Sequence, residues 1–260
     1  MPTYALLGAT GGTGSAILRY YLESPPLGLH LKILVRDKAK LQKAFPDLAE
    51  TAPFHIEIFK GTHEDDAILQ QCLKDATVIH MCIATNISVP TTSICLDTTT
   101  ALISVLESLS QRQGTSYTKP TILQLRSINL NPKATTGAVI ERFVQYCLYY
   151  VYDDLAKGCT LLEQRGKADL HLFDFIFVDP PGLHDAEGST RTGHMLSTTE
   201  KVEGDNLMYA DLGAAFCEIA ERKGEFLGQA VLVSATGKVE LRMMNLLGFV
   251  GTGLKARLWG

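Results

Sequence analysis

The chain has 260 residues, of which 46% are hydrophobic and 20% are charged, and its formal net charge is −4. This balance is typical of a globular protein with a substantial core, and the length fits a single domain over residues 1–260. A slightly acidic chain without blocks of like charge argues against a nucleic-acid surface, because such surfaces are basic.

The sequence carries no signal for a membrane or for secretion. The amino terminus lacks the basic region of a signal peptide, and no apolar run approaches the roughly 18 residues of a membrane span. The six cysteines are scattered and form no C-x-x-C pair, which indicates reduced thiols, several of them buried. We therefore expect a cytoplasmic protein.

Short apolar runs alternate with helical patterns along the chain. Strands are predicted at 4–7, 31–35, 54–59, 77–84, 121–127, 170–178 and 230–235. Helices are predicted at 13–22, 38–45, 65–73, the second half of 91–113, and 140–164. This alternation predicts an α/β fold, a Rossmann-type doubly wound parallel sheet.

The composition changes after Pro180, where Gly, Pro, Ser and Thr become frequent. We expect residues 180–230 to form loops and a small C-terminal substrate-side lobe within the same domain. Residues 239–260 show no sharp pattern, and a C-terminal helix with a loop is expected there.

The glycines of "LLGATGGTGS" lie between the first strand and the first helix. Gly8, Gly11 and Gly14 have the spacing G-x-x-G-x-x-G, and Gly12 lies inside the same turn. In a doubly wound sheet this turn lets the backbone approach a pyrophosphate, while the helix start offers unpaired N–H groups. A tight turn without a ligand is the alternative, but the flanking strand and helix favour a dinucleotide site.

The end of the second strand, "LVRDKAK", indicates which dinucleotide binds. Arg36 follows the strand directly, and a guanidinium can bind the 2′-phosphate of NADP. Asp37 could instead bind a ribose hydroxyl, and Arg36 could be a solvated surface charge. We favour NADP over NAD.

Four segments together resemble a known superfamily. "TYALLGATGGTGS", "ILVRDKAKL", "VIHMCIATN" and "FIFVDPPGLHD" are similar to the atypical short-chain dehydrogenases/reductases, and more closely to their NmrA-like branch. The opening and "YYVYDDLAKGCTLLE" resemble the averufin-oxidase-type oxidoreductases of fungal aromatic polyketide pathways. The likeness covers most of residues 1–185 and is weaker up to about residue 235.

The resemblance implies a set of cofactor contacts. Residues of the glycine turn would line the dinucleotide phosphates, and Arg36 would meet the adenosine 2′-phosphate. The end of the fourth strand would pass the adenosine ribose and lead to the nicotinamide, beside which Pro180-Pro181-Gly182 would run. The turn residues are Gly8, Thr10, Gly11, Thr13 and Gly14, with Gly12 added to the same site, and the strand end is Ala84, Thr85 and Asn86.

The usual catalytic pair of the superfamily is missing at its usual spacing. That pair is a Tyr and a Lys four residues apart on one helix, so that both face the cofactor. Here Tyr149, Tyr150 and Tyr152 precede Lys157 by eight, seven and five residues. We take Tyr152 as the expected proton donor and Lys157 as a ribose contact; the alternatives are aromatic packing and a solvated lysine.

Polar residues near two other strand ends are further candidates. Ser127 ends the fifth strand, where the family's substrate-orienting serine would lie, although Asn129 or Asn131 could serve instead and Ser127 could cap a turn. His184 and Asp185 could touch substrate or form a polar loop pair. The histidines lack metal spacing such as H-E-x-x-H, so no metal site is expected.

Three functions remain open on this evidence. The first is an NADP-dependent oxidoreductase that acts on a hydrophobic, oxygenated small molecule, and the resemblance adds a tailoring role in fungal secondary metabolism. The helix around 143–152 and the "GHMLS" loop would form its pocket walls. The alternatives are a redox-neutral isomerase, dehydratase or cyclase, and a non-catalytic NmrA-like sensor. The oligomeric state is also open, with a homodimer as one option.

Overall fold

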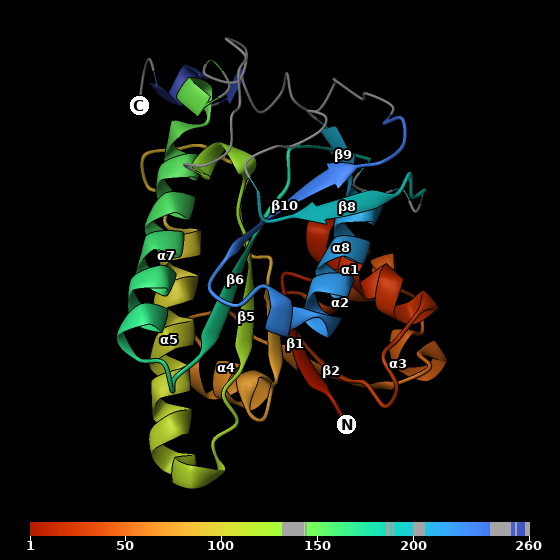
Figure 1. Ribbon diagram of the computed structural model, residues 1–260, viewed down its shortest axis with the longest axis vertical. Helices are drawn as coiled ribbons and strands as arrows, with labels where there is room; N and C mark the ends of the chain where they lie inside the picture. The colour runs from red at the N-terminus through yellow and green to blue at the C-terminus, as the bar shows by residue number, and fades with distance from the viewer. Residues whose placement is uncertain are drawn as a thin grey trace.

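The computed structural model shows a large sheet with helices on both faces (Figure 1). It describes residues 1–131, 143, 145–185, 188, 190–199, 206–239, 251–252 and 254–257. The eight strands of this sheet have the order β3-β2-β1-β4-β5-β6-β10-β8. They are β1 (Thr3–Leu7), β2 (His30–Val35), β3 (His55–Lys60), β4 (Val78–Met81), β5 (Thr121–Leu125), β6 (Asp174–Asp179), β8 (His194–Ser197) and β10 (Ala230–Ala235).

The strand order reverses beside β1. From there the chain adds β2 and β3 on one side and β4, β5 and β6 on the other, all in parallel. Only β8 runs antiparallel to its neighbour in this sheet, β10. In such sheets the connections diverge at the reversal, which leaves a crevice for ligands at the carboxyl ends of the two strands there. The fold therefore points to the carboxyl ends of β1 and β4.

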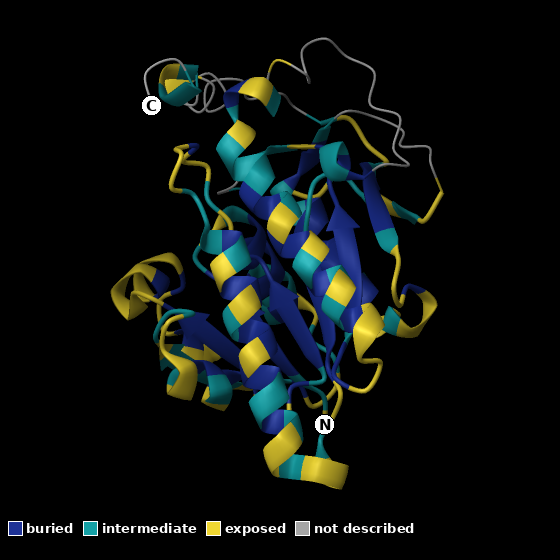
Figure 2. Cartoon of the chain, turned by 90° about the vertical axis from the view of Figure 1, so that its left-hand side faces the viewer, coloured by how far each residue is buried: buried dark blue, intermediate teal, exposed yellow. Residues whose placement is uncertain are grey.

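Helices cover the two faces of the sheet in separate groups. The helices are α1 (Gly12–Glu23), α2 (Lys38–Ala44), α3 (Leu48–Thr51), α4 (Asp66–Leu73), α5 (Ile94–Gln113), α7 (Tyr149–Ala168) and α8 (Tyr209–Glu221). The pair α1 and α8 packs on one face, and α4, α5 and α7 pack on the other. Figure 2 shows α5 and α7 with buried residues toward the sheet and exposed residues outward. This two-sided cover explains why β1, β2, β4 and β6 are almost continuously apolar.

The predicted α/β fold with a parallel sheet is confirmed, and the predicted strands are present. Three of them are shorter than expected, and β5 ends at Leu125 instead of residue 127. β6 begins at Asp174 because residues 169–172 form a turn, in which Leu172 N–H donates to Asp169 O at 3.2 Å. β4 ends at Met81, and the chain then leaves the sheet.

The prediction of loops over residues 180–230 was wrong for part of that segment. The strands β7 (Gly182–His184) and β9 (Asn206–Met208) form a small parallel sheet, and four residues of "GHMLS", His194–Ser197, form β8 instead of a loop. Residues 209–221 form α8, where Gly213 lies so near α1 that a Cβ would come 2.5 Å from Ala16 C. The polar composition of residues 182–206 does not extend into α8, which is apolar on its buried side.

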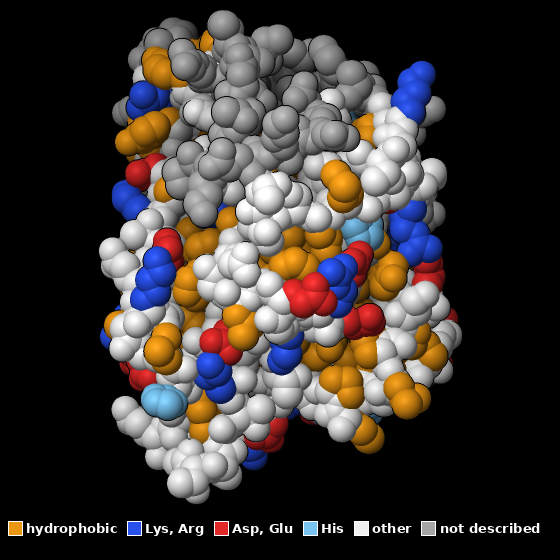
Figure 3. Space-filling model, viewed as in Figure 1, with side chains coloured by type: hydrophobic (Ala, Val, Ile, Leu, Met, Phe, Trp, Pro, Cys, Tyr) orange, Lys and Arg blue, Asp and Glu red, His pale blue; other side chains and the backbone are white. Residues whose placement is uncertain are grey.

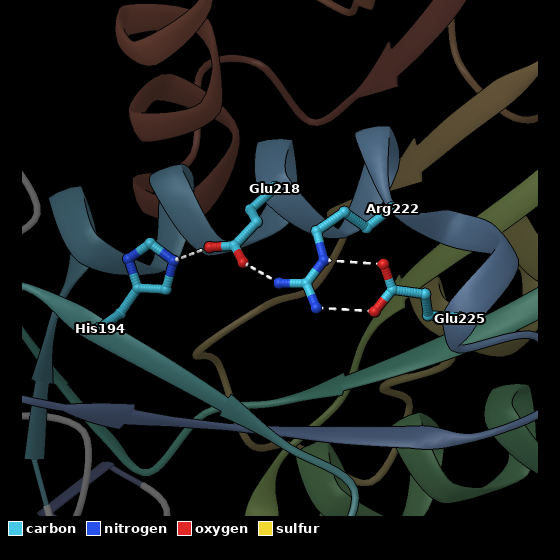
Figure 4. A network of polar contacts seen from close by, with 4 residues as sticks. All are labelled: His194, Glu218, Arg222 and Glu225. Carbon is cyan, nitrogen blue, oxygen red and sulfur yellow. Dashed lines mark hydrogen bonds and ion pairs between the residues drawn. The ribbon is translucent and has the colours of Figure 1, made fainter.

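Polar contacts attach α8 to β8 and to the loop before it. Asp211 is fully buried and accepts hydrogen bonds from Thr192 N at 3.0 Å and Gly193 N at 2.9 Å. His194 Nε2 lies 2.9 Å from Glu218 Oε2, and Glu218 also meets Arg222 (Figure 4). These contacts hold β8 and the loop before it against α8, which itself packs on α1.

Two further predictions are only partly covered by the structure. The helix predicted at 140–164 appears as α7, which continues to Ala168, while residues 140–142 lie outside the described part of the chain. Most of the segment 239–260 lies outside it as well.

On the face shown in Figure 3, Lys and Arg side chains are interspersed with Asp and Glu, which fits the small net charge.

Candidate functional site

The glycine turn lies where β1 meets the reversal point of the sheet. Gly8 has φ +95°, a conformation that L side chains rarely adopt, and a Cβ there would lie 2.7 Å from Cys82 O. A Cβ on Gly14 would lie 2.2 Å from Gly8 O. Both glycines are therefore required for β1, β4 and α1 to approach one another closely.

Gly11 and Gly12 differ in what surrounds them. Among the described residues, a Cβ on Gly11 would meet Gly8 O alone, at 3.4 Å, and Gly11 is itself exposed, so this side of the turn is open. Gly11 is also the N-cap of α1 and has no side chain to bond the first N–H groups of that helix. A Cβ on Gly12 would lie 2.6 Å from the ring of Tyr209, the first residue of α8. Packing of α8 on α1 thus accounts for Gly12 without a ligand.

The neighbouring threonines occupy different environments. Thr13 is buried in the first turn of α1, whereas Thr10 is partly exposed in the glycine turn. Thr10 and Gly11 therefore form the open side of this turn, with the unpaired N–H groups of α1 beside them.

At the end of β2, two charged residues are used differently. The Asp37 carboxylate caps α2, since its Oδ1 accepts hydrogen bonds from Ala39 N at 2.8 Å and Lys40 N at 3.3 Å. Arg36 is exposed and directly precedes it. The structure thus gives Asp37 a structural role and leaves the Arg36 side chain at the surface of this edge.

The residues after β4 lie at the same edge of the sheet. Cys82 N–H donates to Leu7 O at 3.0 Å, so the end of β4 is next to the glycine turn. Beyond it Ala84 and Asn86 are exposed, and Thr85 Oγ1 accepts a hydrogen bond from Ile87 N at 3.1 Å. The sequence-predicted cofactor residues of the first, second and fourth strands are thus brought together at one edge.

A buried ion pair joins the carboxyl ends of β5 and β6. Arg126 Nε donates to Asp179 Oδ1 at 2.7 Å, and Arg126 Nη2 donates to Asp179 Oδ2 at 2.5 Å. Asp179 is fully buried, and the guanidinium stacks 4.4 Å from the centre of the Phe177 ring. Burial raises the pKa of Asp179, and the Arg126 charge opposes that shift. The two hydrogen bonds from Arg126 thus hold the Asp179 carboxylate in place beside the predicted site.

Asp179 fixes both ends of the segment that follows β5. Its Oδ2 also accepts a hydrogen bond from Asn131 Nδ2 at 2.9 Å, so the carboxylate bridges Arg126 and Asn131. Between them lies a 3-10 turn, Ile128–Leu130, and Ile128 N–H donates to Pro180 O at 3.1 Å. The turn is thus fastened to the start of the Pro180-Pro181 segment, where both prolines are buried.

This turn carries the contact with the predicted proton donor. Asn129 Nδ2 donates to Tyr152 Oη at 3.2 Å. Asn129 Oδ1 is buried and has no hydrogen-bond partner among the described residues. Ser127 Oγ accepts a hydrogen bond from Asn129 N at 3.3 Å, so Ser127 caps the turn. Asn129, which sequence reasoning named only as an alternative, is therefore the residue that meets Tyr152.

The structure does not bring Lys157 into this group. Its side chain is 58% exposed, and Nζ lies 2.6 Å from Asp153 on the same helix. The face of α7 toward α5 instead carries Asp154, whose carboxylate accepts hydrogen bonds from Cys95 N and Leu96 N at the start of α5. Five residues at about 100° each separate Tyr152 from Lys157, so the two point in different directions.

The other two tyrosines have aromatic partners. The rings of Tyr149 and Tyr150 lie 5.3 Å apart in an edge-on arrangement. Arg257 lies over both, 4.4 Å from the centre of the Tyr149 ring and 5.7 Å from that of Tyr150. Among the three tyrosines, Tyr152 is thus the one whose hydroxyl meets the turn after β5.

Comparison with known proteins shows which family the chain belongs to. No family model matches the chain. The chain is 48% identical over its whole length to averufin oxidase A of Dothistroma septosporum and covers 93% of that protein. It is 46% identical over 99% of its length to averufin oxidase A of Aspergillus flavus, of which it covers 91%. The chain belongs to the averufin oxidase family. It is accordingly an oxidoreductase, as the sequence resemblance implied.

Solved structures confirm the fold of this averufin oxidase family member. A short-chain dehydrogenase/reductase of Veillonella parvula, solved in complex with NADP, has a TM-score of 0.65 at 11% identity over 91% of this chain and 95% of that one. An NAD-dependent epimerase/dehydratase of Bacillus halodurans has a TM-score of 0.62 at 13% identity over 92% of this chain and 96% of that one. The chain therefore has a Rossmann fold, the fold of these neighbours. None of its described helices combines the length and apolar character that crossing a bilayer would need.

Sequence reasoning missed the residues that shape the site at the carboxyl ends of β5 and β6. Arg126 and Asp179 were not singled out, although each is a charged residue at the end of an apolar strand. A charge in that position needs a partner, because an unpaired buried charge is very costly. That rule, applied to two neighbouring strands, is the signal that could have found the pair.

Proposed function

We propose that this member of the averufin oxidase family is an NADP(H)-dependent oxidoreductase whose substrate is a hydrophobic, oxygenated aromatic polyketide of the averufin kind, in fungal secondary metabolism. The observation that carries the proposal is the contact of Asn129 with Tyr152 at the same sheet edge as the glycine turn. The names of the relatives support the substrate class.

The residues present fit a dinucleotide. The open side of Gly11 and the uncapped start of α1 would receive the pyrophosphate, because both offer backbone N–H groups without side chains in the way. Ala84, Thr85 and Asn86 would follow the ribose, and Pro180 and Pro181 would border the nicotinamide. We leave Gly12 out, since Tyr209 occupies the space beside it.

The charges at the end of β2 favour NADP over NAD. An NAD site needs a carboxylate for the ribose hydroxyls, but the Asp37 carboxylate is bound to the backbone of α2. Arg36 is exposed at the same place and can bind a 2′-phosphate with several donors. Together these support the phosphorylated dinucleotide.

The chemistry is a two-electron change at a carbon–oxygen bond. When bound, the nicotinamide supplies or accepts the hydride. Tyr152 Oη gives a proton to the substrate oxygen as a carbonyl is reduced, or takes it back as the alcohol is oxidised. Asn129 Nδ2 already donates to Oη, so it stabilises the negative charge that develops there as the proton leaves. Asn129 would thus supply part of what a lysine supplies in the superfamily.

The nucleotide preference is tested by titration of the purified protein with NADPH and NADH. We expect NADPH to bind more tightly than NADH. Arg36→Ala should weaken the binding of NADPH about 10- to 100-fold and leave that of NADH unchanged, since hydrogen bonds to charged groups contribute about 1.5–3 kcal/mol. Arg112→Ala, which changes an exposed arginine at the far end of α5, is the matched control. Equal loss for both nucleotides would contradict the role of Arg36.

The reaction type is tested by following the reduced nicotinamide absorbance with averufin and related quinones and ketones. Substrate-dependent change in that absorbance supports oxidoreductase chemistry. Product formed without such a change would replace it with a redox-neutral reaction on the same scaffold. Tight nucleotide binding without any product across the panel would favour a sensor.

A further inference from the structure

A second group of ligating side chains lies at the opposite edge of the sheet. His30 and His55 are the first residues of β2 and β3 and are register partners in the parallel pair. Their ring centres are 4.5 Å apart. Glu57 follows His55 by two residues, so its side chain is on the same face of the sheet. The amino ends of the strands thus gather two imidazoles and a carboxylate, away from the proposed catalytic site.

The three side chains converge on a small volume. One ligand atom of each residue lies within 4.8 Å of the others. His30 Nε2 is 2.6 Å from Glu57 Oε1, an ion-pair distance, and the His55 ring lies beside that of His30. An ion among the three side chains would replace the direct contact of His30 with Glu57 by coordination to each residue.

We propose that His30, His55 and Glu57 form a binding site for a divalent transition-metal ion, with Zn²⁺ as the reference ion. Two imidazoles and one carboxylate are a common donor set for zinc, and three protein ligands leave one position open to water. Mg²⁺ and Ca²⁺ prefer sites made of oxygen ligands, so the two histidines select against them. The site differs from the dinucleotide site in place and in chemistry.

The surrounding charges permit metal binding. Lys32 is on the same face, but its Nζ donates to Lys74 O at 2.8 Å at the end of α4. Cys72 of α4 is buried, and burial raises the pKa of its thiol to about 12, so it stays protonated.

The site is accessible and joins an edge strand to the sheet. His55 is exposed, and Glu57 is 42% exposed in its side chain. β3 is the last described strand on its side of the sheet, where it pairs with β2. An ion held by His30 from β2 and by His55 and Glu57 from β3 would stabilise the native state, because it binds that state and not the unfolded chain.

The test is zinc titration of the full chain, without an affinity tag, by calorimetry and by competition with a chromophoric chelator. We expect one Zn²⁺ per chain, no comparable binding of Mg²⁺, and a higher melting temperature with Zn²⁺. His55→Ala and Glu57→Gln should each lower the zinc affinity at least about tenfold, as loss of even supporting residues does at metal sites. His171→Ala, at an exposed histidine elsewhere, is the matched control.

Several outcomes would overturn the site. Unchanged zinc affinity in both His55→Ala and Glu57→Gln would exclude these residues as ligands. Absence of saturable zinc binding at sub-millimolar concentrations would exclude the site. His55→Ala changes an exposed side chain, so its melting temperature without metal should equal that of the parent chain. Glu57→Gln replaces the ion pair with His30 by a hydrogen bond to an amide oxygen, so its melting temperature without metal should stay within a few degrees of the parent value. Replacement of Zn²⁺ by Co²⁺ gives a second readout, because a thiolate charge-transfer band would identify cysteine ligands instead.

Discussion

The two halves of the proposed catalytic edge are built from different parts of the chain. At the end of β1 the site is made of backbone: a glycine with positive φ, an open turn and an uncapped helix. At the ends of β5 and β6 it depends on side chains, since Asp179 bridges Arg126 and Asn131 in the interior. A backbone site is fixed by a short segment, whereas a side-chain site needs partners that are 53 residues apart.

The largest effect is expected at Asp179. Asp179→Ala leaves the Arg126 charge buried and unpaired, so the free energy of unfolding should fall by about 3–5 kcal/mol. Urea denaturation measures this loss. Asp179→Asn keeps an acceptor and should be milder.

Asp179→Asn also tests whether the two halves of the site act independently. The folded variant should bind NADPH with nearly the parent affinity, because the glycine turn is unchanged. Its kcat should fall, because the turn Ile128–Leu130, which carries Asn129, is held less firmly. If nucleotide affinity and kcat fell together, the two halves would not be independent as described.

The next effect is expected at Tyr152. Tyr152→Phe removes the hydroxyl that Asn129 meets, and kcat should fall by about 10²-fold or more, the range for a general acid or base. Affinity for NADPH should not change. Lys157→Ala is the matched comparison on the same helix, and its exposed side chain predicts little change in kcat. A larger loss in Lys157→Ala than in Tyr152→Phe would reverse the assignment.

The smallest of the three effects is expected at Gly14. The new Cβ of Gly14→Ala would lie 2.2 Å from Gly8 O, and the contact is with backbone, which cannot move away easily. The free energy of unfolding should fall by about 1–3 kcal/mol, and NADPH binding should weaken with it. Gly224→Ala is the matched control, since no atom of the described residues lies within 4 Å of its added Cβ. Equal stability in the two variants would contradict the close approach of α1 to the turn.

Much of the first half could be predicted from the sequence. The apolar runs predict parallel strands because such strands are buried on both faces, and the glycine spacing predicts the turn between β1 and α1. The same reasoning included Gly12 in the cofactor site, but Tyr209, the first residue of α8, occupies the space beside Gly12. A glycine motif shows where a side chain is missing, but it does not show which group fills the space that this leaves.

The second half could be predicted only in outline. The sequence indicated Tyr152 and the end of the fifth strand, but it also favoured Lys157 and Ser127. In the structure Lys157 pairs with Asp153, and Ser127 caps a turn. The partner of Tyr152 is Asn129, 23 residues away. Spacing along a helix limits which side chains share a face, but it does not say which loop packs against that face.

By itself the sequence determined the fold class, the place of the glycine turn between β1 and α1 and the position of an arginine directly after β2, because each depends on local residue patterns. Only the tertiary structure decided which side chains meet at the carboxyl edge and that two histidines and a glutamate gather at the amino edge. The physical reason is that strand register and helix packing bring together residues whose separation along the chain carries no periodic signal.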